Sequence, residues 1–461
     1  MKTIFRISLI VSALALPLCS CSDFLEKEPL SQGTEAIVFK TPEHFEQAAN
    51  ALYNMNGWRN LDGKGFEGSA VDQNTDINGL TSNGGGVVQE SDWHWDKPYS
   101  HIRTCNILLA KANEYDGNQE DIAQSVGTAY FFRAWQHFYL LQYFGGIPIV
   151  DHVLDVSDPV LFGVRNSRYE VIDFIASDLR LAIPLLPKEK DIPESDKGKV
   201  SKEAAKAFLA RVLLYEGTWE KYVPSINYDL DGDGKNDGAG SVKPDNYPSI
   251  TDMLTEAKQM AKEVIEEAQT GTFALWEECD TLSYYYLFNI DDKGGNISNF
   301  RNAGKSSNKE FIFYKKYDYD LARGGINLVH SVLSGYVTNM SAQFGESFLC
   351  RNGLPIRISY TGNMADAQNN PQFLGYETFV GEFRNRDYRF IGCCNSIPDR
   401  ISYAAQNPGR ERVDAILPYP TPVFPKNNEI FDSTDPVYSS ASAVFHPTIR
   451  NKSTIGSFSS R

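Results

Sequence analysis

Basic residues are scarce in this chain relative to acidic ones. Its 461 residues include 44 Lys and Arg against 59 Asp and Glu, which gives a formal net charge of −15. Binding to a nucleic-acid backbone requires clustered basic side chains that neutralise phosphates. The charge balance therefore argues against nucleic acid as a partner. Hydrophobic residues make up 42% and aromatic residues 12% of the chain, a composition that excludes intrinsic disorder.

Cysteine is also sparse, and the seven cysteines contain no C-x-x-C pair. Cys393 and Cys394 are adjacent, which is a poor geometry for a mutual disulfide. We expect the five cysteines that follow Cys21 to be mainly small core residues. One long-range disulfide is the alternative, and the sequence does not specify its partners.

Motifs of enzyme active sites are missing. The sequence contains no H-E-x-x-H, no G-x-S-x-G and no Walker loop. Its seven histidines show no spacing typical of metal ligands, and His137 is expected in the core of an apolar helix. The paired carboxylates of glycosidases are defined by distance, so the many acids do not indicate a hydrolase. We therefore expect a protein that is not an enzyme, with a glycoside hydrolase as the less favoured alternative.

Long apolar runs are absent after the first twenty residues, and that N-terminal segment is typical of a secretory signal. Lys2 and Arg6 precede an apolar stretch over 7–16 that is too short to span a membrane. Cys21 follows a small residue and stands three places after Leu18, the pattern of a lipoprotein cleavage site, and Cys19 fits this pattern less well. We expect residues 1–20 to be a lipoprotein signal peptide, Cys21 to carry the lipid, and 21–40 to be a tether. Acyl chains alone can hold such a protein on a bilayer.

Apolar residues recur at helical spacing through the first half of the mature chain. Thr41-Pro42 is a typical helix start, and Gly145-Gly146 is a typical helix end. The pattern predicts antiparallel helix pairs over 41–271, packed closely as in tetratricopeptide repeats, although no period of about 34 residues is visible. Residues 272–461 lose the helical period and are predicted to be loop-rich, with short β-like runs such as 311–314. The expected fold class is mainly α.

Several segments, in order along the chain, resemble the SusD/RagB family of surface lipoproteins. They are CSDFLEKEP from Cys21, TPEHF from Thr41, YFFRAW from Tyr130, LQYFGGIP from Leu141, SKEAAKAFLARVLLY from Ser201 and FRNRDYR from Phe383. The resemblance implies an outer-membrane, outward-facing lipoprotein that binds glycan and has no catalytic activity. It also implies a TonB-dependent SusC-type transporter as the partner, with a peptide as the alternative ligand. Family members continue into further helices, so the chain is expected to be truncated or to lack its last helical pair.

Exposed aromatic residues would form the glycan site, because a pyranose needs a flat ring to stack on and polar groups for its hydroxyls. Trp93 and Trp95 are two residues apart, so in an extended segment they would point to one side. The alternative is that these tryptophans anchor a long loop onto the helices. The full set of candidates is Trp58, Asp72, Asp76, Trp93, Trp95 and, from a weaker cluster that begins at Trp276, Tyr319.

The segment 229–237 resembles the start of an EF-hand calcium loop. Its candidate ligands are Asp229, Asp231, Asp233, the Lys235 carbonyl and Asp237. The acidic residue expected at position 12 is replaced by Gly240, so a further oxygen would have to come from elsewhere, with Asp245 as the candidate. We expect a structural Ca²⁺ here, and a solvated acidic turn is the alternative.

Overall fold

The computed structural model describes residues 39–54, 92–222, 243–278, 283–284, 287, 308–314, 340–375, 385–387, 389–390 and 457–458. Its main elements are six helices, namely α4 (Pro42–Leu52), α5 (Trp93–Glu114), α6 (Gln119–Phe144), α7 (Arg168–Leu185), α8 (Lys202–Tyr222) and α9 (Ile250–Ala268). All six fall within the region predicted to be helical. The structure thus confirms a mainly α protein of paired helices.

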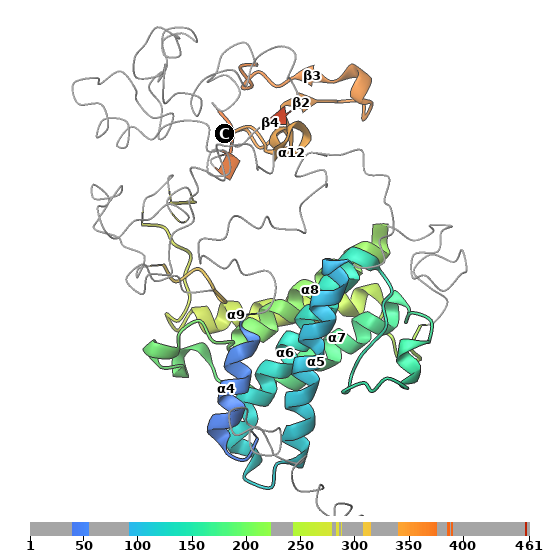
Figure 1. Ribbon diagram of the computed structural model, residues 1–461. Helices are drawn as coiled ribbons and strands as arrows, with labels where there is room; N and C mark the ends of the chain where they lie inside the picture. The colour runs from blue at the N-terminus through green and yellow to red at the C-terminus, as the bar shows by residue number, and fades with distance from the viewer. Residues whose placement is uncertain are drawn as a thin grey trace, which may run out of the picture.

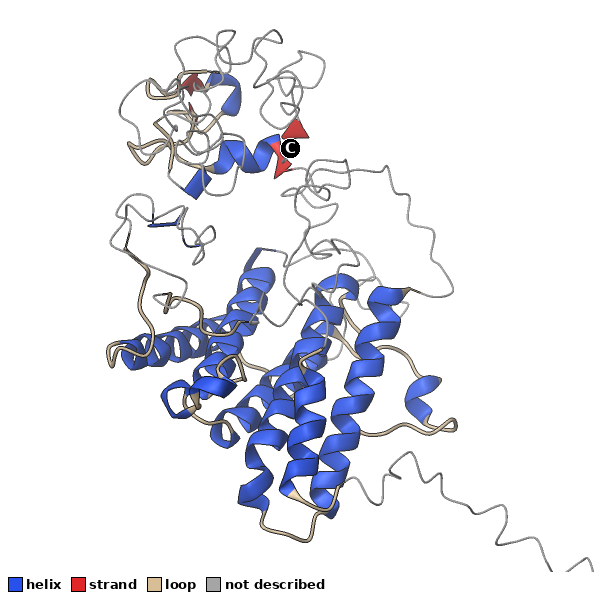
Figure 2. Ribbon diagram, turned by 60° about the vertical axis from the view of Figure 1, so that its left-hand side comes forward, coloured by secondary structure: helices blue, strands red, loops and turns tan. Residues whose placement is uncertain are grey.

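Each long helix packs against the next one along the chain. α5 lies against α6, α6 against α7, α7 against α8 and α8 against α9, while α4 covers α6 and α5 (Figure 1). The view turned by 60° shows the same helices side by side (Figure 2). Consecutive helices that stack in this way are the arrangement expected of a tetratricopeptide-like scaffold. None of the described helices combines the length and apolar character needed to span a bilayer.

Side-chain caps explain where these helices begin. Ser167 and Glu170 form a reciprocal capping box at the start of α7, and Ser249 and Asp252 do the same for α9. The Ser201 hydroxyl accepts a hydrogen bond from the Ala204 amide and so caps α8. α6 ends at Gly145, whose φ of 70° is readily adopted by glycine. Each of these capping signals is formed by residues next to one another in the sequence, so helix positions can be predicted from them.

The core is rich in aromatic rings contributed by α6. Phe131 meets Phe132 edge-on at 5.3 Å and lies 5.5 Å from Phe208 of α8, measured between ring centroids. Both Phe131 and Phe132 are 1% exposed. Burying each such side chain contributes about 1.5–3 kcal/mol. His137 is fully buried on the same helix, as predicted.

Two buried ion pairs tie neighbouring helices together. Arg133 of α6 binds both carboxylate oxygens of Asp178 on α7 at 2.7 Å. Arg168 of α7 donates to Glu216 of α8 at 2.6–3.0 Å, and its guanidinium lies 4.1 Å from the Trp219 ring centroid. Such pairs fix the relative position of the helices, because breaking one leaves a buried charge without its partner.

The described part of the second half contains only short elements. They are β1 (Met340–Ser341), α12 (Ala342–Ser347), β2 (Arg357–Ile358), β3 (Gln368–Asn369) and β4 (Ser457–Phe458), with β1 antiparallel to β4 and β2 to β3. In both views these elements lie apart from the helices (Figures 1 and 2). The predicted β-like run at 311–314 is wrong, since these residues form a loop with bends. Its Phe313 packs instead on Phe131 of α6, with ring centroids 5.4 Å apart.

Cys105 and Cys350 are buried free thiols, in agreement with the predicted core role. Burial raises the pKa of both thiols, so neither is a reactive thiolate. Cys21, Cys279, Cys393 and Cys394 lie outside the described residues. The boundaries predicted for the signal peptide, the tether and the two halves of the chain stay predictions.

Candidate functional site

A cluster of aromatic side chains lies where the first turns of α5 meet the last turns of α6. We call it the aromatic site, and its members are His94, Trp95, Tyr99, Tyr139, Tyr143 and Phe144. Only residues 115–118 connect α5 and α6, so the two helices run antiparallel. This turn brings the beginning of α5 beside the end of α6.

Trp95 is partly exposed, and three neighbours hold its indole ring. Phe144 meets the ring edge-on at a centroid distance of 5.0 Å, and Tyr99 lies at 5.1 Å. The Arg165 guanidinium lies 5.1 Å from the indole centroid, in a cation–π position. A ring fixed in this way can stack on the C–H face of a sugar, while the guanidinium can donate hydrogen bonds to sugar hydroxyls.

His94 adds a second flat surface beside Trp95. Its imidazole stacks on the Tyr143 ring with centroids 4.6 Å apart and planes 25° apart. His94 Nδ1 lies 2.7 Å from the Tyr139 hydroxyl, a hydrogen bond that joins α5 to α6. The Asp92 carboxylate accepts from the His94 amide at 2.8 Å and caps α5. His94 is therefore fixed both through its backbone amide and through its imidazole ring.

The rings of the aromatic site are uncharged at neutral pH. Burial lowers the pKa of His94 below its usual value, and the nearby Asp92 carboxylate opposes this effect. Burial raises the pKa of the Tyr99 and Tyr139 hydroxyls. Arg165 at the Trp95 ring and Asp92 at the His94 amide are charged groups in contact with the site. Neutral rings and hydroxyls, flanked by one guanidinium and one carboxylate, suit an uncharged polyhydroxylated ligand.

Two hydrogen bonds fix the loop that carries Arg165, one to α5 and one within the loop itself. The Tyr99 hydroxyl donates to the Pro148 carbonyl at 2.8 Å. Asn166, next to Arg165, accepts a hydrogen bond from the Ile149 amide at 3.0 Å through its side chain. The two ends of the loop are thus tied together at Ile149 and Asn166, the neighbour of Arg165. The aromatic site is preorganised by these contacts.

The predicted geometry of Trp93 and Trp95 is wrong. α5 begins at Trp93, so both residues lie in a helix and not in an extended segment. Residues two apart in an α-helix are about 200° apart around the axis, so positions 93 and 95 do not share a helix face. The contacts of Trp95 with Tyr99 and Phe144 also agree with the alternative that it anchors the chain onto the helices. A contact with glycan stays a prediction for both residues.

Most of the other predicted site residues lie outside the described residues. These are Cys21, Trp58, Asp72, Asp76, Asp229, Asp231, Asp233, Lys235, Asp237 and Tyr319. Within the described ranges, no group of three or more His, Cys, Asp or Glu side chains is arranged to hold a metal ion. The weaker aromatic cluster loses its first member, because Trp276 is only 4% exposed and its ring is not available for surface stacking.

The sequence predictions missed His94, Tyr139, Tyr143 and Arg165. Tyr139 and Tyr143 are four residues apart in a predicted helix, which places them on one face. That spacing was a usable signal, but nothing in it indicated that α5 would bring Trp95 and His94 to the same face. Arg165 comes from the loop between α6 and α7, and only the folded chain shows that it reaches Trp95.

Comparison with known families gives one clear match. Residues 23–214 match the SusD-like family described as starch-binding and associating with the outer membrane. This segment contains α4–α7 and the first turns of α8, and it therefore includes the whole aromatic site.

Curated relatives and solved structures agree with this match. A SusD-like protein of Bacteroides ovatus is 25% identical over 62% of this chain and 54% of its own length. SusD-like protein P2 of Formosa agariphila is 25% identical over 50% of this chain and 47% of its own length. The crystal structure of a SusD-like carbohydrate-binding protein from Bacteroides fragilis aligns with a TM-score of 0.50 at 19% identity, over 77% of this chain and 60% of that one.

The chain spans about half the length of the curated relatives it matches. The structural likeness concerns the fold, and the family match concerns residues 23–214. The family match covers the same part of the chain as most of the sequence segments that resemble the SusD/RagB family. Over residues 23–214 the chain is similar to the SusD-like family, and it shares the fold of a SusD-like carbohydrate-binding protein.

Proposed function

We propose that this protein is a lipid-anchored, outward-facing outer-membrane protein that binds glycan and delivers it to a TonB-dependent SusC-type transporter. The match of residues 23–214 to a family described as starch-binding and associating with the outer membrane supports the binding role. The observation that carries the proposal is the partly exposed aromatic site, in which the Arg165 guanidinium lies over the Trp95 ring and His94 stacks on Tyr143. The signal sequence and Cys21 support the lipid anchor.

Binding at a few aromatic rings is weak by itself. A dissociation constant of 1 mM corresponds to only about −4.1 kcal/mol. Retention of a polysaccharide therefore requires several contacts along one chain, or closure of the protein onto its transporter. This is why a polymeric ligand suits the site better than a single sugar.

Affinity electrophoresis of the purified chain in gels that contain starch, laminarin or other polysaccharides tests the binding role. Replacing Trp95 or Tyr143 with Ala should weaken retention by about tenfold, since each change removes a stacking surface. Tyr222→Ala is the matched control, because Tyr222 is an aromatic side chain 71% exposed at the end of α8. Equal retention of all three variants, or retention only of peptide ligands, would refute the proposal.

Melting curves separate binding from anchoring in the same variants. If Trp95→Ala lowers retention and leaves the melting temperature unchanged, the ring acts on the ligand. If it lowers the melting temperature by several degrees while Tyr143→Ala leaves retention intact, Trp95 has only the anchoring role.

We further propose that the protein acts without catalysis. The buried carboxylates of Asp178 and Glu216 are each bound to an arginine, so neither is available as a general acid or base. Incubation with the polysaccharide that is retained best should release no reducing ends. Release that survives further purification would assign a hydrolase instead.

The anchor and the calcium site are proposed on sequence alone. Cys21→Ser should abolish labelling with radioactive palmitate and move the protein out of the membrane fraction.

Titration of chelator-treated protein with Ca²⁺ should release heat and raise the melting temperature, and Asp231→Asn should abolish both effects. Co-purification of a TonB-dependent transporter with a tagged chain tests the partner.

A further inference from the structure

The loop that joins α6 to α7 has a first part that is bonded to the helices and a later part that carries Arg165. Four hydrogen bonds fix residues 150–154. They run from Asn106 to the Val150 and His152 carbonyls, from Arg133 to the Asp151 carbonyl and from Arg103 to the Leu154 carbonyl, at 2.8–3.2 Å. The Arg165 guanidinium lies over the Trp95 ring of the aromatic site. Contacts between the two parts of the loop therefore help to fix Arg165.

His152 bonds the fixed part of this loop to η2 (Pro159–Leu161). Its Nδ1 lies 2.6 Å from an oxygen of Asp151, and its Nε2 lies 2.7 Å from an oxygen of Asp158. The other oxygen of Asp158 accepts from the Val160 amide at 3.0 Å and so caps η2. The Asp158 side chain is only 12% exposed. One imidazole thus connects position 152 to the start of η2.

The geometry of this contact requires a protonated imidazole. A neutral imidazole has one N–H group, whereas both nitrogens of His152 lie within hydrogen-bond distance of a carboxylate oxygen. Loss of the proton would leave a nitrogen lone pair facing the oxygen of Asp151 or Asp158. The two hydrogen bonds also raise the pKa of His152. The complete contact therefore forms as His152 gains a proton near neutral pH.

The charged groups around His152 favour its cationic form. Asp155 is a third carboxylate of the loop, and hydrogen bonds from Ser157 and the nearby His152 both lower its pKa. Two guanidinium groups, those of Arg103 and Arg133, reach this part of the loop from α5 and α6. Both donate to backbone carbonyls of the loop. The carboxylates therefore remain to interact with the imidazolium.

We propose that His152 is a positioning residue of the aromatic site, a clamp that closes the loop when its imidazole is protonated and so holds Arg165 over Trp95. This role rests on the proposed function, because it affects the ligand only if glycan binds at the aromatic site. When the imidazole loses its proton, one of its two bonds to Asp151 and Asp158 is lost and the loop loosens. Glycan is therefore held more firmly at mildly acid pH than at alkaline pH.

Affinity electrophoresis of the purified chain at about pH 6.5 and about pH 9 tests the clamp, with the polysaccharide that is retained best. At the lower pH most of His152 is protonated while most of His94 in the aromatic site is neutral, because the pKa of His152 lies above the ordinary value of 6.5 and that of His94 lies below it. At about pH 9 histidines in proteins have lost their proton. Retention by the wild type should fall by about threefold between the two pH values, the size expected when one exposed ion pair is lost.

Two substitutions of His152 separate its charge from its shape. His152→Gln has no positive charge, so its retention at pH 6.5 should equal that of the wild type at pH 9 and should change little with pH. His152→Arg keeps its charge at both pH values and can donate to two carboxylates, so its retention at pH 9 should exceed that of the wild type. The same fall with pH in the wild type and in His152→Gln would overturn the proposal.

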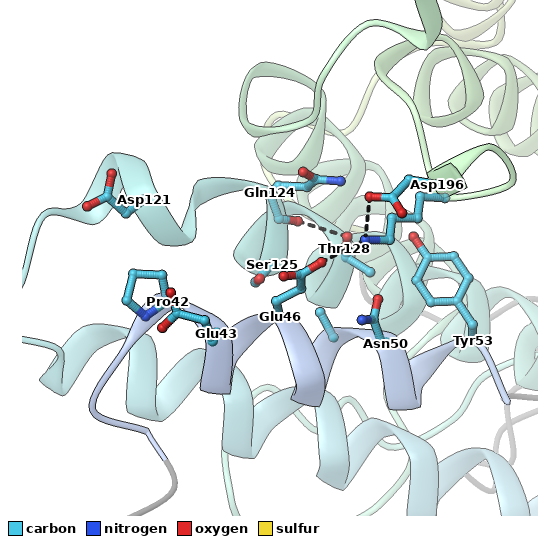
Figure 3. A pocket seen from close by; sticks show the side chains of 12 residues that line it. Pro42, Glu43, Glu46, Asn50, Tyr53, Asp121, Gln124, Ser125, Thr128 and Asp196 are labelled. Carbon is cyan, nitrogen blue, oxygen red and sulfur yellow. Dashed lines mark hydrogen bonds and ion pairs between the residues drawn. The ribbon is translucent and has the colours of Figure 1, made fainter. Parts of the chain in front are cut away.

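The matched control is an ion pair near the opposite end of α6. Glu46 of α4 binds Lys199 at 2.8 Å in the acidic pocket between α4, α6 and η4 (Glu194–Asp196), which Figure 3 shows from close by. Ser125 lines this pocket and lies five turns of α6, roughly 27 Å, from Tyr143 of the aromatic site. Glu46→Gln should leave retention and its pH dependence unchanged. If it weakens retention as much as His152→Gln does, the loss is not specific to the loop and the proposal fails.

Amide hydrogen exchange without glycan separates the clamp from the proposed function. At about pH 6.5 the amides of residues 160–165 should exchange about threefold faster in His152→Gln than in the wild type, because the loop opens more often. If no polysaccharide is retained at either pH, the proposed function fails, while faster exchange in the variant still supports the clamp. Equal exchange rates in the two proteins would refute the clamp even where glycan is retained.

Discussion

The buried ion pair between Arg133 and Asp178 offers the sharpest test of how the helices are held together. Arg133 donates from Nε and Nη2 to Asp178, and from Nη1 to the Asn106 side chain and the Asp151 carbonyl at 2.8 Å each. The side chains of the pair are 7% and 2% exposed. The guanidinium therefore joins α5, α6, α7 and the loop that leads from α6 to Arg165.

Asp178→Ala removes the counter-charge and leaves the guanidinium buried. Breaking one partner of such a pair typically costs about 3–5 kcal/mol. We expect the lower end, about 3 kcal/mol, because the guanidinium keeps its bonds to Asn106 and Asp151. Burial already raises the pKa of Asp178 against the opposing effect of Arg133, so desolvation is substantial in the native protein.

Glu256→Ala is the matched control for this experiment. Glu256 of α9 also receives two hydrogen bonds from an arginine of α7, Arg180, at 3.0 and 2.7 Å. That pair is 44% and 31% exposed, so its loss should cost no more than about 1 kcal/mol. The two variants thus differ in burial and share the same chemistry.

Urea unfolding followed by far-ultraviolet circular dichroism measures both losses. The double variant Arg133→Met with Asp178→Leu should recover part of the stability lost by Asp178→Ala, since no buried charge then remains. A loss for Asp178→Ala of about 1 kcal/mol or less, equal to that of Glu256→Ala, would show that burial of the pair does not matter and would refute the reasoning.

Three further predictions concern titration and close packing. Burial lowers the pKa of His137 to about 3, so below about pH 6.5 the unfolded chain binds a proton that the native chain does not. The free energy of unfolding should therefore fall by up to roughly 1.4 kcal/mol per pH unit between pH 6.5 and pH 3. His137→Gln should reduce this slope in acid unfolding curves. Hydrogen bonds that the His152 imidazole donates to the Asp151 and Asp158 carboxylates raise the pKa of His152. Its stabilising effect on the loop should therefore be present at acid pH and be lost as pH rises through the raised pKa. An NMR titration of the imidazole should show the upward shift, and Asp158→Asn should reduce it. Gly127→Ala should destabilise the protein by about 1–3 kcal/mol, because the added Cβ would lie 3.0 Å from the Leu185 Cβ. Gly217→Ala should cost less, because the closest contact of its added Cβ is the end of the flexible Leu254 side chain. Equal melting temperatures for the two variants would contradict this.

Helix positions were the most predictable part of the fold. The starts at Thr41, Ser167 and Ser249 use side chains or a proline whose capping role is local, so a short stretch of sequence contains the whole signal. The burial of His137 was predictable for the same reason, because its neighbours along the helix are apolar. The antiparallel pairing of α5 and α6 follows from the short connection 115–118 between them.

The aromatic site was predictable only in part. Trp95 was identified as a candidate, but it was expected in an extended segment. The Asp92 cap and the first-turn acid Asp96 were the local signals for a helix that begins at Trp93. His94, Tyr143 and Arg165 were missed because each is identified by a contact with another element.

The sequence by itself determined the mainly helical fold, the approximate position of the described long helices apart from the start of α5, and the family resemblance, because capping, apolar spacing and short motifs are properties of neighbouring residues. The tertiary structure alone decided which side chains meet. It placed the start of α5 against the end of α6 at the aromatic site, and it placed α4, α6 and η4 around an acidic pocket. Contacts between residues far apart in sequence depend on how the helices pack, and packing is a property of the whole folded chain.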